Sequence, residues 1–344
     1  MSKALLITGA TGKQGGSVID ALLSQASSTS SQTNPQKFTI LAVTRDPSSP
    51  ASQRLLRKSN PEKGVAIKLV KGNLDDIPAL FASAKEALKS TTSPSLQIHG
   101  VYSVQVSLGP GVTVQGEINQ GKSLIDGAIA NGVRHFVYSS VERGGDEHSW
   151  NNTTPIPHFQ TKHAIEHHLR DVSAIKTLGG DDAEDAAGKH MEWTILRPVA
   201  FMDNLAPGMP TKVFLAAMKN HIGDKGKKVQ WVATKDIGVF AAKAFTSPEE
   251  WKNRAVGLAG DELDMEGLDR SFMRATGRNV PLGYGFMGSI LTWAVKEMGL
   301  MIGWFADEGY KADIEARRKE HPGMLTMEMW LAQEDSPFAA GDTN

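Results

Sequence analysis

Six short apolar runs of strand length, separated by segments with helical periodicity, constrain the fold of this 344-residue chain more than any other feature. The runs lie at residues 4–8, 38–44, 65–71, 99–104, 136–139 and 193–196. Between them, apolar residues recur three and four positions apart within 18–23, 80–88 and 118–129. Strands that are apolar on both faces and alternate with amphipathic helices form parallel sheets covered on both sides. The sequence therefore predicts an α/β fold with a doubly wound parallel sheet.

The pattern becomes irregular after the last of these runs, which predicts a second lobe in a chain long enough for two. We expect residues 1–200 to form the sheet domain, with residues 229–260 returning to it. Residues 201–228 and 261–332 would form a smaller substrate or partner lobe, followed by a flexible tail at 333–344. Helical patterns in this half of the chain cover residues 211–219, 236–245, 262–275, 288–301 and 307–319.

Composition excludes several classes of protein. The chain has no cysteine, which rules out disulfides, thiolate metal sites and a cysteine nucleophile, and favours the cytoplasm, with the nucleus as an alternative. Because 37 basic residues face 38 acidic ones, we expect no direct binding to nucleic acid and none to membranes. The longest apolar stretch, residues 288–305, is interrupted by Lys296 and Glu297, so it predicts a buried or pocket-lining helix and not a membrane span.

Two polar segments resemble insertions. Residues 24–36 have no periodicity and separate the first helical pattern from the second apolar run. Residues 179–189 are acidic and rich in glycine, but they lack the ligand spacing of a calcium loop. A solvated turn is the favoured interpretation of the second segment.

The turn after the first apolar run, in the stretch LLITGATGKQGG, is built from small residues. Gly9, Gly12 and Gly15 follow each other at three-residue spacing, and a helical pattern begins directly after them. Glycines let a backbone turn tightly and approach a pyrophosphate, whose charge then lies against N–H groups at a helix start. This position predicts a dinucleotide-binding turn; a tight strand-to-helix connection without a ligand is the alternative.

The end of the second apolar run selects between dinucleotides. An acidic residue there hydrogen-bonds a ribose 2′-hydroxyl, whereas a basic residue accommodates a 2′-phosphate. Thr44 and Arg45 occupy this position, which favours NADP(H) as the ligand. Asp46 directly follows them and is the competing candidate.

The segment GEINQGKS, at residues 116–123, also fits the pattern of a phosphate-binding P-loop in which Lys122 would reach the terminal phosphates. Such a loop leaves a strand abruptly, but Gly116 lies several residues past the fourth apolar run. Ile118 and Leu124 belong to one continuous helical face. We therefore expect a helix here and not a phosphate loop.

Several motifs occur along the chain, and their order is more informative than any one of them. They are GATGKQGGSV, TRDP, EINQGKSLIDGAIANGVRHFVYSS, HFQTKHAIEHHLR, WTILRPVAFMDN and KDIGVFAAKAF. Together they resemble the NmrA-like proteins, an atypical branch of the short-chain dehydrogenase/reductase superfamily, from the first strand to about residue 330. The resemblance implies a Rossmann-type domain with a smaller C-terminal α/β lobe.

The resemblance also implies which residues contact NADP(H). Arg45 would bind the 2′-phosphate, and Lys162 would hydrogen-bond the nicotinamide ribose. The pyrophosphate would lie against Gly9, Thr11, Gly12, Lys13, Gln14, Gly15 and Gly16. Adenine, ribose and nicotinamide would be bordered by residues at later strand ends, namely Asn73, Leu74, Ser103, Gln105, Ser139, Val199, Phe201 and Asn204.

The catalytic centre departs from the superfamily pattern. Ordinary members use Tyr-x-x-x-Lys, in which the lysine lowers the pKa of the phenol so that it exchanges a proton. Here His158 stands four residues before Lys162, and all four tyrosines of the chain lie elsewhere. Lys162 alone or the imidazole of His158 are the candidate catalytic groups. The simpler interpretation, which we favour for His158, is that it packs against or caps the helix start.

Two further groups have a simple structural interpretation. His163 and His167 are four residues apart on one predicted helix, but no third metal ligand is evident, so a solvated helix face is favoured and no metal is expected. Methionines and aromatic residues between Phe286 and Trp304 fit an apolar substrate pocket, a partner-binding groove or core packing equally well.

Two functions from different classes follow. The first is a redox-responsive regulator that binds NADP(H), changes conformation with the cofactor's redox state and docks on a protein such as a transcription factor. The second is an NADPH-dependent reductase of a small hydrophobic carbonyl or enone, with Lys162 and His158 moving protons. The missing tyrosine favours the redox sensor, which is the function that we predict from the sequence. The cofactor motifs and the aromatic second lobe keep the oxidoreductase as the alternative.

Overall fold

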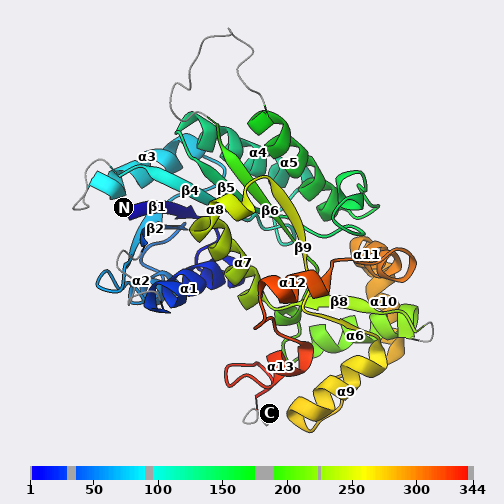
Figure 1. Cartoon of the computed structure of the whole chain (residues 1–344). Helices are drawn as coiled ribbons and strands as arrows, with labels where there is room; N and C mark the ends of the chain where they lie inside the picture. Colours follow the sequence, from blue (N-terminus) through cyan, green and yellow to red (C-terminus); the bar gives the residue numbers. More distant parts are fainter. Residues whose placement is uncertain (1, 29–35, 90–95, 175–189, 224–225, 340–344) are drawn as a thin grey trace. The chain divides into compact units, whose positions relative to one another are not determined.

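The computed structural model describes residues 2–28, 36–89, 96–174, 190–223 and 226–339, and Figure 1 shows its course. Part of the expected polar insertion, residues 29–35, and the whole acidic segment, residues 179–189, lie outside the described residues. The chain divides into two compact units. The first unit comprises Met1–Ser140, Ala164–Leu196 and Ile237–Ala255, and the second comprises Val141–His163, Arg197–Asp236 and Val256–Asn344.

A seven-stranded sheet with the order β3-β2-β1-β4-β5-β6-β9 forms the core of the first unit. Its strands are β1 (Ser2–Ile7), β2 (Lys37–Thr44), β3 (Val65–Lys71), β4 (Ile98–Ser103), β5 (His135–Ser139), β6 (Glu192–Pro198) and β9 (Arg254–Leu258). The pairings from β3 through β6 are all parallel. The strand order reverses between β1 and β4, and ligands of such sheets bind at the carboxyl ends of the strands beside this switch point.

The strands form where the apolar runs predict them because both faces of the sheet are covered. Leu5, Leu6, Ile40 and Leu41 are fully buried, although neighbouring residues on a strand point to opposite faces. Figure 1 shows α3 and α4 on one face and α1 and α7 on the other. The prediction of a doubly wound α/β sheet is confirmed. The helices that lie wholly or mostly in the first unit are α1 (Lys13–Ser28), α2 (Pro50–Leu56), α3 (Ile77–Lys89), α4 (Val114–Ala130), α5 (Pro157–Ala174), α7 (Thr234–Thr246) and α8 (Pro248–Trp251).

The segment with the P-loop pattern lies inside α4. This helix begins at Val114, where the hydroxyl of Thr113 accepts a hydrogen bond from the N–H of Gly116 at 3.0 Å. Lys122 is therefore a residue of a helix interior, two turns from its start. The prediction of a helix at this place is confirmed.

A three-stranded sheet with the order β10-β8-β7 lies in the second unit, built from β7 (Ala200–Phe201), β8 (Val229–Val232) and β10 (Asp261–Leu263). Residues 141–163, 197–200, 229–236 and 256–260 belong to this unit, whereas the sequence pattern predicts them in the sheet domain. For residues 229–236 the difference arises because β8 pairs with β7 and β10 and not with the large sheet. The remaining elements are η1 (His148–Trp150), η2 (Met202–Asn204), α6 (Met209–Ile222), α9 (Met265–Thr276), α10 (Gly285–Ala294), α11 (Lys296–Asp307), α12 (Ile314–Glu320) and α13 (Met327–Leu331).

The helix predicted over residues 288–301 is wrong as a single element, because the chain breaks at Val295 into α10 and α11. The two helices approach so closely that a Cβ on Gly299 would lie 2.7 Å from the carbonyl oxygen of Thr292. The helix predicted over 307–319 begins only at Ile314, after a turn in which Gly309 has a φ of 68°.

Part of the expected C-terminal tail packs against other elements. The ring of Phe338 lies 5.0 Å from that of Phe272 and 6.5 Å from that of Trp330. Only residues 340–344 of this tail lie outside the described residues. Across the parts of the chain that the structure describes, no helix combines the length and the apolar character that a membrane span requires.

Candidate functional site

The turn between β1 and α1 has a shape that requires glycine. Gly9 has a φ of 59°, and a Cβ there would lie 2.8 Å from the side chain of Val104. A Cβ on Gly15 would lie 2.4 Å from the carbonyl oxygen of Gly9, whereas a Cβ on Gly16 would have no neighbour nearer than 3.7 Å. Residues 11–13 between them are exposed. The first turn of α1, whose N–H groups have no acceptor within the helix, therefore begins at an accessible edge of the sheet.

Gln14 joins the start of α1 to the ends of two strands. Its Oε1 accepts hydrogen bonds from the hydroxyl of Ser139 at 2.6 Å and from the hydroxyl of Tyr102 at 3.3 Å. Burial raises the pKa of the Tyr102 phenol well above its ordinary value, so this group stays protonated and donates. Gln14 and Ser139, which the resemblance assigns to different parts of the cofactor, thus contact each other.

The two charged residues that follow β2, Arg45 and Asp46, differ in whether other groups of the protein already bind their side chains. Arg45 is exposed, and no hydrogen bond or ion pair holds its side chain within the described residues. The carboxylate of Asp46 accepts hydrogen bonds from the N–H of Ser48 at 2.8 Å and from its hydroxyl at 2.5 Å. These bonds lower the pKa of Asp46. Because the turn itself uses the carboxylate, the guanidinium is the group left available at this strand end.

The predicted adenine contacts lie on the loop after β3. The side-chain amide of Asn73 donates to the carboxylate of Asp75 at 2.9 Å, and Gln120 donates to the same carboxylate at 2.7 Å. Leu74, which stands between Asn73 and Asp75 in the sequence, is half-buried. The loop is therefore shaped by its own polar side chains before any ligand is considered.

The end of β4 carries a buried polar group with an unused acceptor. The side-chain N–H of Gln105 donates to the hydroxyl of Ser103 at 2.8 Å, and both residues are buried. The Oε1 of Gln105 has no hydrogen-bond partner among the described residues. Buried polar atoms are almost always paired, so this oxygen fits a hydroxyl or amide donated by a ligand. The open glycine turn, the exposed guanidinium of Arg45 and this acceptor together fit a phosphorylated dinucleotide.

The candidate acid–base residues lie at the start of α5, in the second unit. Nδ1 of His158 lies 2.5 Å from Oε1 of Glu297, which also accepts the backbone N–H of His158 at 3.1 Å. The side chains of His158 and Glu297 are 15% and 28% exposed. Lys162 lies one helical turn further and is buried, at 6% exposure. The expectation that His158 packs at the helix start fits these contacts, but its partner is a carboxylate from a distant part of the chain.

The residues expected to close over the nicotinamide lie around β7. Val199 is buried and donates its N–H to the carbonyl of Leu258 at 3.2 Å, and Phe201 is half-buried in the small sheet. Asn204 is exposed at the end of η2. The neighbouring Asp203 accepts hydrogen bonds from the N–H and the hydroxyl of Thr234, at 2.8 Å and 2.6 Å.

The two histidines that invited a metal interpretation have separate partners. Nε2 of His163 lies 3.0 Å from the carbonyl oxygen of Trp150, and Nδ1 of His167 lies 3.0 Å from the guanidinium of Arg170. Within the described ranges, no three potential metal ligands gather around one point.

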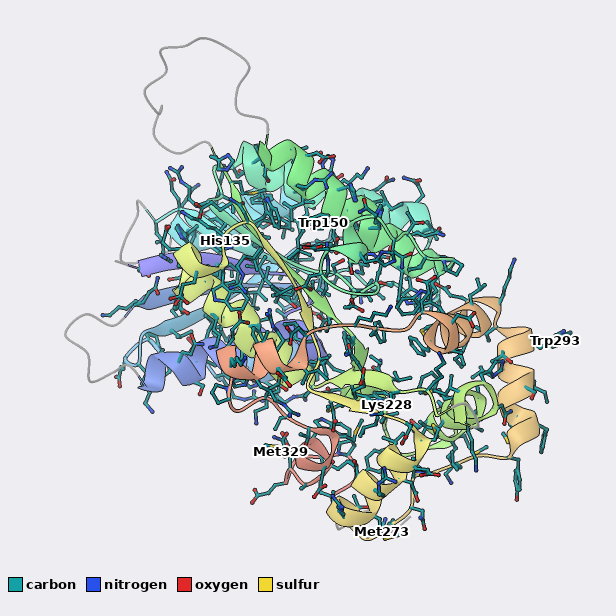
Figure 2. The ribbon with its side chains drawn as sticks, turned by 45° about the vertical axis from the view of Figure 1, so that its right-hand side comes forward. His135, Trp150, Lys228, Met273, Trp293 and Met329 are labelled. Carbon is teal, nitrogen blue, oxygen red and sulfur yellow. The ribbon has the colours of Figure 1, made fainter. Side chains whose placement is uncertain are left out.

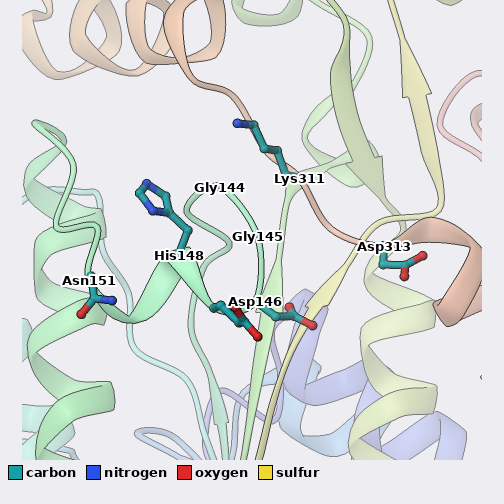
Figure 3. Close-up of a pocket in the computed structure, with 8 residues that line it drawn as sticks. Gly144, Gly145, Asp146, His148, Asn151, Lys311 and Asp313 are labelled. Carbon is teal, nitrogen blue, oxygen red and sulfur yellow. The ribbon is translucent and has the colours of Figure 1, made fainter.

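A polar pocket of about 580 Å³ lies in the second unit, and Figure 3 shows that two segments line it, the chain after β5 and the chain before α12. The N–H groups of three lining residues, Gly144, Gly145 and Lys311, donate hydrogen bonds to the buried carboxylate of Glu142. Burial raises the pKa of Glu142, although these N–H groups oppose the shift. The pocket is lined by Gly144, Gly145, Asp146, Glu147, His148, Asn151, Lys311 and Asp313.

A second pocket of about 560 Å³ is formed mainly by α10 and α11. Leu300 and Trp304 contribute apolar surface to it, and Lys296 and Asp307 contribute charge. Trp293 at its edge is 86% exposed and projects from α10 in Figure 2. Of the residues for which the sequence left a pocket, a groove or core packing open, Trp293, Leu300 and Trp304 thus line this pocket, and Trp304 is at the same time largely buried.

Sequence reasoning missed two carboxylates. Glu142 carries no motif, so nothing in the sequence indicates that it is buried. Glu297 had one signal, since it interrupts the longest apolar stretch of the chain. A charge retained within an apolar helix often has a partner, but the partner, 139 residues away, cannot be read from the sequence.

The large sheet, its strand order and the glycine turn define a fold of the Rossmann class. Residues 1–331 match the NmrA-like family, and the chain belongs to that family. This confirms the resemblance seen in the motifs.

Two relatives by sequence are NmrA-like family domain-containing oxidoreductases of Aspergillus species. The one from Aspergillus flavus is 24% identical over 272 residues, which cover 78% of this chain and 72% of the relative. The one from Aspergillus hancockii is 26% identical over 282 residues, which cover 80% and 73%.

Two solved structures share the fold. NmrA, a negative transcriptional regulator, superposes with a TM-score of 0.62 at 16% identity, covering 98% of this chain and 96% of NmrA. The triphenylmethane reductase of a Citrobacter species, complexed with NADP(H), gives a TM-score of 0.61 at 15% identity, covering 96% and 99%.

Proposed function

We propose that this protein binds NADP(H) and reduces a small hydrophobic carbonyl or enone compound. The observation that carries the cofactor part is the β1–α1 turn, where a Cβ on Gly15 would collide with the backbone at 2.4 Å, together with the exposed Arg45 at the end of β2. NADP(H) is also the ligand of the structurally similar triphenylmethane reductase, and NmrA has been crystallised with NADP.

In this proposal the first turn of α1 binds the diphosphate through its N–H groups, and Arg45 pairs with the 2′-phosphate. The unpaired Oε1 of Gln105 accepts a hydrogen bond from a ribose hydroxyl. Lys162 hydrogen-bonds the nicotinamide ribose, and Val199, Phe201 and Asn204 border the nicotinamide. The bound cofactor supplies a hydride, so the residues of this chain need only orient the substrate and supply a proton.

The enzymatic part of the proposal rests on His158 and Lys162, which are one turn apart on α5 and largely withdrawn from solvent. An imidazole at this spacing from the lysine can supply the proton that the missing tyrosine would supply. The sequence relatives named as oxidoreductases support an enzyme. The apolar surface of Leu300 and Trp304 in the α10–α11 pocket supports a hydrophobic substrate.

Turnover separates this proposal from binding alone. NADPH consumption would be followed by absorbance with small aromatic aldehydes and enones, cinnamaldehyde among them. We expect turnover that Lys162→Ala lowers by at least about 100-fold, the usual size of an acid–base contribution. Absence of turnover with every compound, despite saturable NADPH binding, would contradict the reductase.

A second candidate is the redox-responsive regulator, favoured by the absence of a tyrosine four residues before Lys162 and by the structural similarity to a negative transcriptional regulator. A regulator needs a conformational equilibrium that NADP and NADPH shift differently, since equal affinity for both conformations shifts nothing. Hydrogen exchange measured with each cofactor form would reveal such a difference. This candidate adds a protein partner such as a transcription factor, and a nuclear as well as a cytoplasmic location.

A further inference from the structure

We propose that Glu297 is a positioning residue that fixes the imidazole of His158 in one tautomer and one orientation, so that Nε2 is the atom that delivers the proton during reduction. The inference rests on the proposed reductase function and adds to it a group that no sequence motif indicates. Its parts are the carboxylate of α11, the start of α5 and an aromatic cluster that joins the two helices.

The contacts define the tautomer. A carboxylate accepts hydrogen bonds and donates none, so the atom that faces Oε1 of Glu297 at 2.5 Å, Nδ1 of His158, must carry a hydrogen. In the neutral ring the other nitrogen, Nε2, then has the free lone pair. Among the described residues, no hydrogen bond engages Nε2. The reactive nitrogen is thereby left for a substrate.

The same oxygen of Glu297 also fixes the ring in space. Oε1 accepts the backbone N–H of His158 at 3.1 Å, one of the helix-start donors that lack an acceptor within α5. The imidazole and the backbone N–H of His158 therefore both bind Oε1 of Glu297. These two bonds restrict rotation of the imidazole about its bond to the backbone. A carboxylate that acted only as a helix cap would not need the contact to Nδ1.

An aromatic cluster defined by Phe159, Trp304 and Tyr310 keeps the two helices in register. The ring of Phe159, next to His158, lies 5.5 Å from that of Trp304 and 6.3 Å from that of Tyr310. Trp304 belongs to α11, two helical turns past Glu297, and all three residues of the cluster are buried. The imidazole itself meets the ring of Phe159 edge-on at 4.8 Å. Packing of Trp304 against Phe159 therefore holds α11 against the start of α5, where Glu297 meets His158.

The proton balance is simple. The imidazolium of His158, stabilised by the carboxylate, gives its Nε2 hydrogen to the substrate oxygen, or to the enolate that an enone yields, as the cofactor's hydride reaches carbon. The O–H or C–H bond forms as the Nε2–H bond breaks. The ring is left neutral with its hydrogen on Nδ1, and a proton from water restores the imidazolium. Substrate gains two hydrogens, and NADPH becomes NADP⁺.

The tautomer is tested without any turnover. Long-range proton–nitrogen NMR spectra of protein labelled with ¹⁵N-histidine would identify the His158 signals by their loss in His158→Gln. We expect Nδ1 to show the shift of a protonated nitrogen in the neutral ring. In Glu297→Gln the amide is able to accept or to donate, so we expect a mixture of tautomers. A neutral ring whose single hydrogen is on Nε2 in the wild type, or an unchanged spectrum in Glu297→Gln, would overturn the proposal.

The role in catalysis is tested by a double-mutant cycle with NADPH and cinnamaldehyde. Because general acids contribute about 10²–10⁴-fold, we expect His158→Gln to lower kcat by at least about 100-fold and Glu297→Gln by at least about tenfold, with NADPH affinity unchanged. The double variant should be no slower than His158→Gln, since Glu297 acts only through His158. Glu315→Gln removes an exposed carboxylate of α12 and should leave kcat unchanged.

Each outcome decides a different question. A Glu297→Gln variant as fast as the wild type, or one that slows the His158→Gln protein by the same factor again, would refute the positioning role. A wild-type protein that binds NADPH but reduces none of the compounds would refute the reductase proposal and with it the proton transfer. In that case the NMR spectrum still decides whether Glu297 fixes the imidazole.

Discussion

The glycine turn of the first unit and the His158–Glu297 pair of the second unit are assembled in opposite ways. The turn is local, since a Cβ on Gly15 would meet the backbone of Gly9 and Thr8, six and seven residues earlier. The pair joins residues 139 positions apart in the chain. The shape of the turn depends on backbone geometry close in the sequence, whereas the pair needs tertiary packing. The first is therefore readable as a sequence motif, and the second is not.

A buried histidine of the first unit and a buried carboxyl of the second unit have pKa values that are shifted in opposite directions. In the first unit, burial lowers the pKa of His135 to about 4, helped by the nearby charges of His99 and Lys3. The second unit buries an acid, Glu142, whose pKa is raised. Acid should therefore weaken the first unit, whereas raising the pH should weaken the contribution of Glu142 to the second.

The largest effect is expected at Gly15. In Gly15→Ala the new Cβ would lie 2.4 Å and 2.7 Å from the carbonyl oxygens of Gly9 and Thr8, which are backbone atoms that cannot rotate away. Overpacking of this kind costs about 1–3 kcal/mol, and an opened turn should lower NADPH affinity by at least about 100-fold. Urea unfolding and NADPH fluorescence would measure both quantities.

Gly16→Ala is the matched control for stability in this turn. Its Cβ would have 3.7 Å of room, and alanine is the better helix former by about 1 kcal/mol. The free energy of unfolding should stay the same or rise. Equal destabilisation by both substitutions would show that the turn does not depend on the close approach at Gly15.

The next largest effect is the loss of stability that His135 causes in acid. In the unfolded chain His135 binds a proton below about pH 6.5, whereas in the folded protein it binds one only near pH 4. The free energy of unfolding therefore falls as the pH drops from 6.5 to 4. At about 1.4 kcal/mol per pKa unit the full effect is roughly 3 kcal/mol. His135→Gln, which offers an amide N–H to the hydroxyl of Thr194, should flatten the pH dependence of the unfolding free energy between pH 6.5 and 4. An equally steep curve in the variant would contradict this.

A smaller effect of opposite sign is expected at Glu142. Glu142→Gln leaves one oxygen to accept the N–H groups of Gly144, Gly145 and Lys311, which should cost about 1–3 kcal/mol in acid. As the pH rises above 4.5, the unfolded carboxyl ionises first, so the wild type loses part of its advantage over the variant. Unfolding free energies of both proteins at pH 4.5 and 7.5 would show the difference narrowing. A widening difference would mean that the three N–H groups outweigh burial.

The same difference between local and long-range contacts decides how much of the structure could be predicted from the sequence. The strands and the glycine turn were predictable because continuous apolar runs and backbone collisions depend on neighbouring residues. Leu5, Leu6 and Gly15 carry this information themselves. The break at Val295 and the partner of His158 depend on how α11 packs, and no local pattern encodes that. Residues 229–236 were assigned to the other unit because pairing partners of a four-residue strand are not specified by its own sequence.

The central claim is that the turn after β1 binds a dinucleotide whose 2′-phosphate is selected by Arg45. The most direct test is the dissociation constant of NADPH and of NADH for the wild type, Arg45→Ala and, as a control, Arg54→Ala, which removes an exposed arginine of α2. Loss of a charged hydrogen bond of about 1.5–3 kcal/mol predicts NADPH binding weakened by about tenfold to a hundredfold in Arg45→Ala only, with NADH binding unchanged. An unaltered preference for NADPH in Arg45→Ala, or no saturable binding to the wild type, would contradict the account.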